Sequence, residues 1–384
     1  MTKYIYADKF FLPYGVEQKG YLEITDDGKF GSYTKEIEAN QEVVDYSGYY
    51  IAPGLFDTHI HGFAGADVMD NDPEGLQKMS EGLLSCGVTS FLATTLTADH
   101  DLLREVAATV ADTMGKEKGA KIQGIYFEGP YFTEKYKGAQ NPKYLGAPDL
   151  AEFNSWQEAA KGNIKKIALA PEYEASPDFI KAVTEQGVVV SLGHSNGTLE
   201  DAKKAVESGA SMFVHVYNGM RGLNHREPGM VGAALSLEGV YGELICDGHH
   251  VHPNACEIVM ESMGHDHVAM ISDCMRAGGM PEGNYMLGEL PVTVKNGTAR
   301  LKEGNLAGSI LRLKDGVKNV VEWNIATAEQ AIKMASYVPA KSMNLDHVCG
   351  QIKKGLAADF LVLTKDMQLK ETYLDGVSRY INED

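Results

Sequence analysis

The sequence contains few of the residues on which small secreted or zinc-binding modules depend. It has only five cysteines and two tryptophans in 384 residues. The number of cysteines is odd and no CxxC spacing occurs, which argues against both a disulfide framework and a zinc knuckle. We therefore expect buried core thiols at Cys86, Cys246, Cys256, Cys274 and Cys349.

Long apolar runs are missing as well. No stretch approaches the roughly 18 consecutive apolar residues of a membrane span, and no basic, apolar leader opens the chain. Hydrophobic residues make up 44% and charged residues 23% of the sequence, as in ordinary globular proteins. We expect a cytoplasmic protein with no membrane partner.

Positive charge is scarce, because 35 lysines and arginines are set against 53 aspartates and glutamates, for a formal net charge of −18. A nucleic-acid backbone or an anionic membrane would be repelled over most of such a surface. This excludes nucleic acid as a general partner. An anionic small substrate would need a local basic pocket.

The residue pattern divides the chain into two predicted domains. Residues 1–52 alternate apolar and polar positions in short runs, and residues 340–384 return to that pattern, so both ends should build one small β-sandwich domain. Residues 53–339 instead alternate apolar runs with helical segments, such as Thr198 to Gly209 with Thr198 as N-cap.

The central part contains eight apolar runs typical of buried strands, and a count of eight favours an α/β fold of the (β/α)8 TIM-barrel type. A barrel needs about 250 residues, although the pattern alone does not show closure. The runs are GLFDTHIHG, VTSFLATTL, IQGIYFEGP, IKKIALAPE, GVVVSLGHS, ASMFVHVYN, YGELICDGHH and HVAMISDCM.

Two features interrupt this repeat near its end. Asn296-Gly297 is a strong type I′ turn signal and predicts a β-hairpin insert near residues 285–304. After it, two further helices are expected, around residues 314–324 and 327–343.

Polar side chains gather where the apolar runs stop. His59 and His61 share one face of a strand and can reach a single cation. Any one such histidine is most often structural, but the joint placement at the carboxyl ends of barrel strands favours a functional site. The other members are Glu128 on the third run, His194 on the fifth, His215 on the sixth and Asp273 on the eighth.

Four imidazoles and two carboxylates suit a divalent metal such as Zn, Fe, Co or Mn. The absence of a thiol from these positions argues against a structural zinc site. A catalytic metal lowers the pKa of a bound water to about 7 and polarises a carbonyl, and hydrolysis then needs a general acid and base. Asp273 is our candidate for that role; the alternatives are a further metal ligand or an ion-pair partner.

These residues resemble the amidohydrolase superfamily, and closely its N-acetylglucosamine-6-phosphate deacetylase family. The HxH element and the terminal GQIKKGLAADFLVL are common in the superfamily, whereas the other motifs together are much more specific. The likeness covers nearly the whole chain, through APGLFDTHIHG, FEGPYF, KGAQNP, LAPE, LGHSNGT, HVYNGM, REPGMVG, DGHHV, SDCM and LAGS.

The resemblance implies that Glu128, His194 and His215 hold the principal metal and that Asp273 is the general acid and base. It implies a second metal on His59 and His61, with Glu128 bridging. Other members have amides in place of these two histidines and bind one metal, so one or two ions per subunit remain open. Many superfamily relatives have a carbamylated lysine at the end of the fourth strand. Here that strand ends in ALAPE and has no lysine there, so the resemblance implies that Glu128 takes the bridging place.

For the substrate, the resemblance implies a phosphorylated amino sugar in amino-sugar catabolism and cell-wall recycling. The residues implied in its binding are Ala139, Gln140, Asn218, Gly219, Arg226, His250, Leu306, Ala307 and Gly308. Arg226 offers a charge-assisted fork to phosphate, against the alternative of an ion pair with Glu227. A homodimer is also implied, in which an arginine or histidine can serve the neighbouring subunit.

Two positions depart from the family pattern. Gln140 stands where some members have histidine, and its amide can hydrogen-bond an acetyl oxygen but carries no charge. Arg312, in GSILRL, introduces a cation to which we assign no role. The alternatives are another amidohydrolase, such as a cyclic-amide hydrolase or a deaminase, and an inactive barrel that only binds amino-sugar phosphate. The missing lysine at the end of the fourth strand and the presence of Arg226 disfavour the first alternative. The complete set of ligands and the retained base disfavour the second.

Overall fold

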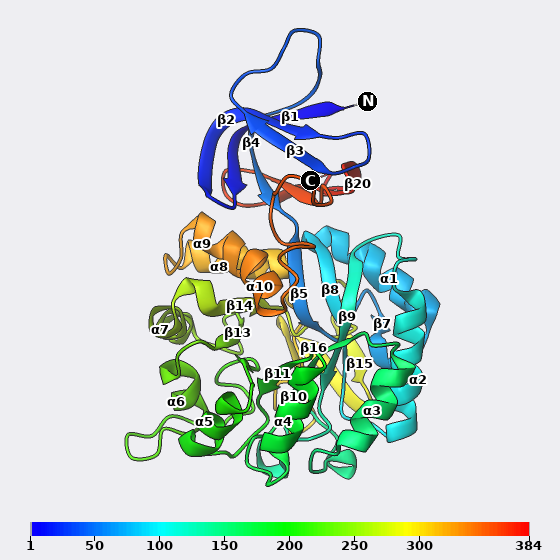
Figure 1. The fold of residues 1–384 in the computed structure, drawn as a ribbon, viewed down its shortest axis with the longest axis vertical. Coiled ribbons are helices and arrows are strands. Elements are labelled where there is room, and N and C mark those ends of the chain that lie inside the picture. The colour runs from blue at the N-terminus through cyan, green and yellow to red at the C-terminus, as the bar shows by residue number, and fades with distance from the viewer. Residues whose placement is uncertain (1, 384) are drawn as a thin grey trace.

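A computed structural model describes residues 2–383, which form a barrel with a separate sheet at one end (Figure 1). The eight predicted strands are all present and lie parallel in one sheet, in the order β14-β13-β12-β11-β10-β9-β8-β5. Their bounds are β5 Leu55–Ile60, β8 Val88–Thr95, β9 Lys121–Glu128, β10 Ile164–Leu169, β11 Val189–Leu192, β12 Met212–Phe213, β13 Tyr241–Ile245 and β14 Val268–Ile271.

The sheet closes between its first and last strands. Ile60 pairs in parallel with Cys274 just beyond β14, and the Asp273 N–H donates to the His59 carbonyl at 2.9 Å. This closure brings the carboxyl ends of all eight strands to one opening, here called the mouth. The predicted fold class is confirmed.

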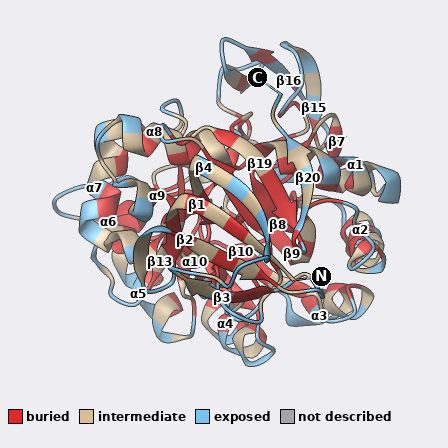
Figure 2. Cartoon of the chain, turned by 90° about the horizontal axis from the view of Figure 1, so that it is seen from above, coloured by how far each residue is buried: buried red, intermediate tan, exposed pale blue. Residues whose placement is uncertain are grey.

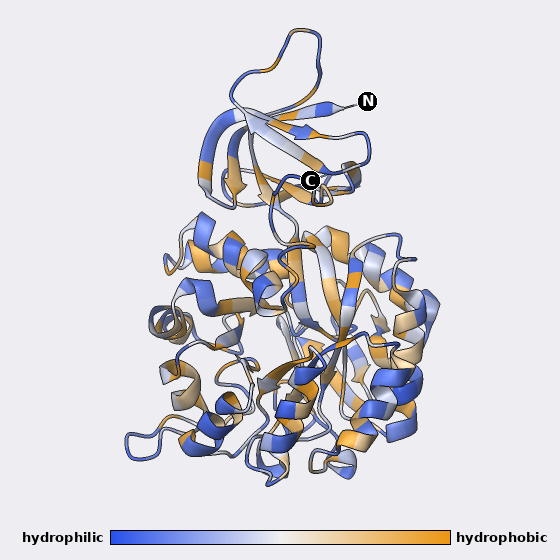
Figure 3. Ribbon diagram, in the orientation of Figure 1, coloured by the Kyte–Doolittle hydropathy of each residue, from blue (hydrophilic) through white to orange (hydrophobic). Residues whose placement is uncertain are grey.

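Helices surround this sheet (Figure 2). These outer helices carry many hydrophilic residues, as the hydropathy colouring shows (Figure 3). The bounds are α1 Pro73–Leu83, α2 His100–Thr113, α3 Leu150–Ala159, α4 Ser176–Glu185, α5 Leu199–Glu207, α6 Gly229–Ser236, α7 Pro253–Met263, α8 Leu313–Glu322, α9 Ala328–Met334 and α10 Tyr337–Ser342. Single 3₁₀ turns span Val68–Asp70, Leu84–Cys86, Glu134–Tyr136, Pro142–Tyr144 and His265–His267.

The segment around residues 327–343, expected as one helix, is divided into α9 and α10. Pro339 has no N–H to donate to the Ala335 carbonyl, so a continuous helix would lose that hydrogen bond. The backbone leaves the helical region at Ser336, with φ −135° and ψ −75°. By contrast, Thr198 caps α5 as expected, and its hydroxyl accepts from the Asp201 N–H at 3.2 Å.

Both ends of the chain build the second sheet, here called the end domain. Its strands are β1 Lys3–Leu12, β2 Gly15–Ile24, β3 Phe30–Thr34, β4 Glu42–Pro53, β18 Phe360–Leu363, β19 Leu369–Leu374 and β20 Val377–Ile381, in the order β20-β19-β18-β4-β1-β2-β3. Three strands separate β3 from β18, yet the rings of Phe30 and Phe360 lie 6.2 Å apart. The sheet therefore folds over itself to enclose an apolar core.

The end domain lies at the amino ends of the barrel strands, opposite the mouth (Figure 1). β4 runs into β5 through Gly54, whose N–H donates to the Asp359 carbonyl at 3.0 Å. The division of the chain at residues 52/53 and 339/340 stays a prediction, and its second boundary falls inside α10. None of the helices in residues 2–383 is long and apolar enough to cross a bilayer.

The expected hairpin insert forms an antiparallel sheet of β15 Gly283–Leu287, β16 Leu290–Lys295 and β17 Thr298–Leu301. Asn296 and Gly297 join β16 to β17 with φ values of 50° and 74°, as a type I′ turn requires. A smaller ribbon pairs β6 Gly62–Phe63 with β7 Ala66–Asp67.

Candidate metal centre

The side chains predicted to bind metal meet at the mouth, and three of them sit on unusual backbone. His194, His215 and Asp273 follow β11, β12 and β14 with φ values of 45°, 23° and 48°. Such left-handed backbone is uncommon for residues other than glycine and concentrates at functional sites. All three residues therefore combine an uncommon backbone conformation with a place just after the end of a barrel strand.

The first group joins Glu128, the last residue of β9, to His194 and His215. Glu128 Oε1 lies 3.1 Å from His194 Nε2 and 3.2 Å from His215 Nε2, and the two nitrogens are 3.1 Å apart. All three residues are buried. Their ligand atoms lie close enough together to hold one ion.

The hydrogen bonds of the two imidazole rings indicate which of their nitrogen atoms can bind a cation. His194 Nδ1 donates to the Tyr136 carbonyl and His215 Nδ1 to the Asn218 carbonyl, each at 3.0 Å. A neutral imidazole then presents a lone pair on Nε2. With both rings neutral, two nitrogen lone pairs would face a carboxylate oxygen, and a divalent cation suits that donor set.

A second group shares Glu128 and adds His59 and His61. His61 Nε2 lies 3.4 Å from Glu128 Oε2, and His59 Nε2 lies 3.5 Å from Glu128 Oε1. The two Nε2 atoms are 3.3 Å apart, and His61 Nδ1 donates to the Thr94 carbonyl at 3.3 Å. Glu128 therefore lies between two sets of imidazoles, as a bridging ligand would.

The carboxylates around the centre favour positive charge there. Burial lowers the pKa of His59, but Glu243, Asp273 and Glu128 together outweigh it and raise that pKa to about 9. Burial raises the pKa of Glu128, but His59, His194 and His215 outweigh it and hold that pKa well below its usual value. Burial lowers the pKa of His215, which keeps its imidazole neutral as a ligand must be.

Asp273 lies against the second group. Its Oδ1 is 3.2 Å from His61 Nε2 and 3.4 Å from His59 Nε2. The residue lines the cavity at the mouth. This position suits either a proton acceptor for a water in the cavity or a further ligand.

A cavity of about 320 Å³ opens above the ligands. Most residues implied in sugar binding line it, namely Ala139, Gln140, Asn218, Gly219, His250, Leu306 and Gly308. Gln140 is anchored at both ends of its amide: Nε2 donates to Glu128 Oε2 at 2.7 Å, and Oε1 accepts from the Thr97 N–H at 2.9 Å. One of its amide hydrogens thus serves Glu128 directly.

Three singled-out residues lie outside the lining of this cavity. Ala307 is fully buried behind it, whereas Arg226 and Arg312 are exposed elsewhere. Within residues 2–383 Arg226 forms no ion pair with Glu227, whose Oε1 instead accepts the N–H groups of Leu199 and Gly229. Among the described residues that line the cavity there is no lysine or arginine.

Apart from the predicted metal ligands, His250 is the basic side chain among the described residues that line the cavity. Its Nδ1 is 2.6 Å from Asp247 Oδ2, and Asp247 Oδ1 also accepts the His250 N–H. Burial lowers the pKa of His250, but the hydrogen bond and charge of Asp247 outweigh it and raise that pKa above 6.5. A protonated His250 therefore offers a positive donor to an anion.

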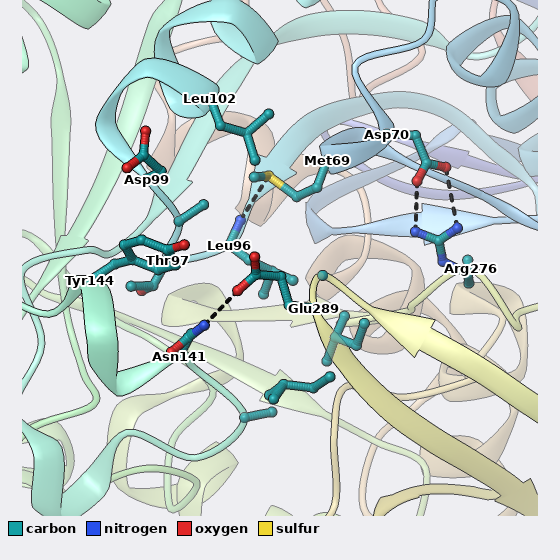
Figure 4. Close-up of a pocket in the computed structure, with 15 residues that line it drawn as sticks. Met69, Asp70, Leu96, Thr97, Asp99, Leu102, Asn141, Tyr144, Arg276 and Glu289 are labelled. Carbon is teal, nitrogen blue, oxygen red and sulfur yellow. Dashed lines mark hydrogen bonds and ion pairs between the residues drawn. The ribbon is translucent and has the colours of Figure 1, made fainter.

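A second cavity of about 170 Å³ lies beside the first (Figure 4). Leu96, Ala139 and Leu287 line both cavities and form the wall between them. The hairpin insert closes this side, since Asn141 Nδ2 donates to Glu289 Oε2 at 2.7 Å in the turn between β15 and β16.

Sequence reasoning missed two buried charges beneath the ligands, Lys166 on β10 and Glu243 on β13. Glu243 Oε2 is 3.0 Å from His59 Nδ1, and Oε1 pairs with Lys166 Nζ. Burial raises the pKa of Glu243, but Lys166 and His59 outweigh it and lower that pKa to about 2. A signal was present, because a charged residue within a buried parallel strand is rare unless it is paired.

Comparisons with known proteins agree with this geometry. The model of the amidohydrolase family matches residues 50–378. The chain is 42% identical over 327 residues to the N-acetylglucosamine-6-phosphate deacetylase of Vibrio furnissii, covering 85% of this chain and 82% of that one. It is 38% identical over 327 residues to the N-acetylgalactosamine-6-phosphate deacetylase of Escherichia coli O157:H7, with 85% and 86% covered.

A solved structure gives the same result. The chain superposes with a TM-score of 0.94 on a mutant N-acetyl-D-glucosamine-6-phosphate deacetylase from Mycobacterium smegmatis in complex with N-acetyl-D-glucosamine-6-phosphate. The two sequences are 26% identical, and the superposition covers 98% of this chain and 99% of the other.

Proposed function

Because the chain belongs to the amidohydrolase family, we propose that it hydrolyses the acetamide of N-acetylglucosamine 6-phosphate to glucosamine 6-phosphate and acetate. The observation that carries this proposal is the convergence of Glu128 Oε1, His194 Nε2 and His215 Nε2 within 3.2 Å of one another, in a cavity that Asp273 also lines. Curated deacetylases of this substrate at 34–42% identity support it.

The cofactor in this proposal is a divalent metal, with Zn, Fe, Co and Mn as the candidates. Glu128, His194 and His215 would hold the principal ion, and His59 and His61, which share Glu128 with that group, would hold a second. When bound, such an ion lowers the pKa of a water to about 7 and polarises a carbonyl. All remaining steps belong to side chains of this protein.

Asp273 accepts the proton of the attacking water and returns it to the departing amine nitrogen. Its Oδ1 lies within 3.4 Å of the Nε2 atoms of His59 and His61, and the residue lines the cavity in which that water would react. Gln140 holds Glu128 with one amide hydrogen and has a second with which to orient the acetyl oxygen.

The sugar phosphate occupies the other end of the cavity in this proposal. Asn218, the Gly219 backbone, His250 and the backbone of Leu306 to Gly308 bind it. The lining lacks a lysine or arginine among the described residues, so Arg226 of a second subunit supplies the main positive charge. We therefore propose a homodimer. A sugar phosphate does not cross a bilayer unaided, so we place the enzyme in the cytoplasm with its substrate.

The proposal is tested by acetate release from four sugars, N-acetylglucosamine and N-acetylgalactosamine, each with and without the 6-phosphate. Protein stripped of metal by a chelator, and the same protein after metal is restored, are assayed in parallel. We expect metal-dependent release from N-acetylglucosamine 6-phosphate with kcat/KM at least tenfold above its unphosphorylated form. Equal rates with and without the phosphate would refute the phosphate site, and a preference for the galactose epimer would reassign the substrate.

A further inference from the structure

His59 differs from the other three histidines of the centre in what holds its second ring nitrogen. The Nδ1 atoms of His61, His194 and His215 all donate to backbone carbonyls. His59 Nδ1 instead faces a side-chain carboxylate, Glu243 Oε2, at 3.0 Å. Three rings are therefore oriented by the backbone, whereas the orientation of His59 depends on another side chain.

Glu243 is itself held from several sides. It lies on β13 with no exposed surface, and its Oε1 pairs with Lys166 Nζ on β10, which is equally buried. The His215 N–H also reaches Glu243 Oε2, at 3.4 Å. Since a buried carboxylate must be paired to remain ionised, Lys166 keeps Glu243 as an acceptor for His59.

The ring of Tyr126 on β9 completes this arrangement. Lys166 Nζ lies 3.9 Å from its centroid, in the geometry of a cation–π contact. The imidazole of His59 packs edge-on against the same ring, with centroids 4.9 Å apart and an interplanar angle of 89°. Lys166 and His59 therefore contact one aromatic ring from two elements, which fixes the plane of the imidazole.

We propose that Lys166 and Glu243 are positioning residues that keep the proton of His59 on Nδ1 and thereby present Nε2 as a ligand to the second ion. This inference rests on the two-ion centre proposed above and deepens it. A carboxylate acceptor on a ligand histidine fixes its tautomer and makes the other nitrogen a better donor to metal. Loss of the pair weakens the ion at His59 and His61 and spares the ion at Glu128, His194 and His215.

The test is a Co²⁺ titration of the metal-free protein, followed by visible absorbance and calorimetry. The binding step that disappears in His59→Ala identifies the second ion. Two double variants distinguish the charge of Glu243 from its role as hydrogen-bond acceptor for His59. Lys166→Met with Glu243→Gln keeps a neutral acceptor, and Lys166→Met with Glu243→Met removes the acceptor. Replacement of a buried ion pair by apolar side chains of similar volume is usually tolerated.

We expect the Met–Met variant to raise the Kd of the His59-dependent step about ten- to hundredfold, the usual effect of removing such a partner. The Kd of the other step should stay within about threefold, and the Met–Gln variant should lie nearer to the unaltered protein. Lys121→Met is the control, because it removes ion pairs to Asp359 and Asp375 between barrel and end domain and should leave both steps unchanged.

A folded Met–Met variant with an unchanged His59-dependent step, or with both steps weakened equally, would overturn this inference alone. A single step that is insensitive to His59→Ala would overturn the two-ion proposal together with it. A measurement on the unaltered protein is independent of whether any variant folds. In the ¹⁵N spectrum of the metal-loaded, histidine-labelled protein, we expect a protonated Nδ1 at His59, and the opposite tautomer would contradict the inference.

Discussion

At the scale of single residues, the position of Asp273 is compatible with two roles, that of a general base and that of a metal ligand. Its Oδ1 lies 3.2 Å from His61 Nε2, within reach of an ion held there and of a water beside it. Its backbone is held by the N–H bond to the His59 carbonyl at 2.9 Å. Chemistry rather than geometry must therefore distinguish the two roles.

Replacement Asp273→Asn makes that distinction. An amide keeps the shape of the carboxylate but accepts no proton, so we expect kcat to fall by about 10²- to 10⁴-fold, the usual contribution of a general acid or base. Metal content and binding of the sugar phosphate should change little. Elemental analysis and calorimetry measure these. A loss of metal would make Asp273 a ligand, and turnover within tenfold of the unaltered enzyme would refute the base.

The pair of Asp247 and His250 predicts a pH dependence of substrate binding. Asp247 raises the pKa of His250, so His250 is protonated below that raised pKa and loses its positive charge as pH rises through it. KM should therefore increase with rising pH. In Asp247→Asn the pKa of His250 falls, and the increase in KM should move to lower pH.

The expected size of this change in KM follows from the hydrogen bond that a protonated His250 would donate to the substrate phosphate. A bond to a charged group contributes about 1.5–3 kcal/mol, or about ten- to hundredfold in KM. Steady-state profiles of both proteins on the same substrate correct for ionisation of the phosphate itself. Superimposable KM profiles would show that His250 does not contact the anion.

Single residues also mark the limit of sequence reasoning. The sequence pattern predicts six site residues, because each lies where an apolar run stops. They are His59, His61, Glu128, His194, His215 and Asp273. Lys166 and Glu243 lie within such runs, in IKKIAL and YGELI, and the sequence does not state which strands face each other across a barrel. Their pairing depends on closure, which a linear pattern cannot show.

At the scale of elements, strands were easier to predict than their connections. Each barrel strand is buried on both faces and so reads as an apolar run, as in VTSFLATT of β8 with every residue buried. The left-handed backbone at His194, His215 and Asp273 had no sequence signal, because non-glycine residues adopt it only where the surrounding structure imposes it.

The hairpin insert gives an element-scale prediction. Leu287 at the end of β15 is 2% exposed and lines the wall of the catalytic cavity, whereas Met286 beside it is 41% exposed. Leu287→Ala should lower stability by about 2–5 kcal/mol and raise KM without changing metal content. Met286→Ala, the matched control, should stay within about 0.5 kcal/mol. Thermal unfolding and steady-state kinetics measure both.

If Leu287→Ala destabilised the protein but left KM unchanged, the hairpin would be a structural cover with no part in substrate binding. The wall that Leu96, Ala139 and Leu287 form between the two cavities would then not contribute to recognition.

At the scale of the whole molecule, the negative net charge of the chain is one reason for the proposed homodimer. The net charge of −18 repels an anionic substrate, and the cavity lining includes His250 but neither lysine nor arginine among the residues described. Arg226 lies exposed on a surface loop, three residues after Leu223, which is 61% exposed. In the proposed homodimer, a second copy of the chain would bring that loop to the phosphate.

Complementation tests this arrangement. Arg226→Ala should raise KM for the phosphorylated sugar about tenfold or more, as expected for loss of a charge-assisted bond, while kcat changes little. A mixture with Asp273→Asn should recover low-KM turnover, because a mixed dimer combines an intact Asp273 with Arg226 from the other chain. Sedimentation establishes the assembly. A monomer, or a mixture with no recovery, would contradict a shared site.

The proposed metal centre is tested most directly by anomalous diffraction from crystals of the metal-loaded protein, collected at the absorption edge of the metal. We expect a peak bonded to Glu128, His194 and His215 at about 2.0–2.2 Å, the usual length for nitrogen and oxygen ligands of zinc. A peak elsewhere in the molecule, with no metal bound to these three side chains in fully loaded crystals, would contradict the proposed metal centre.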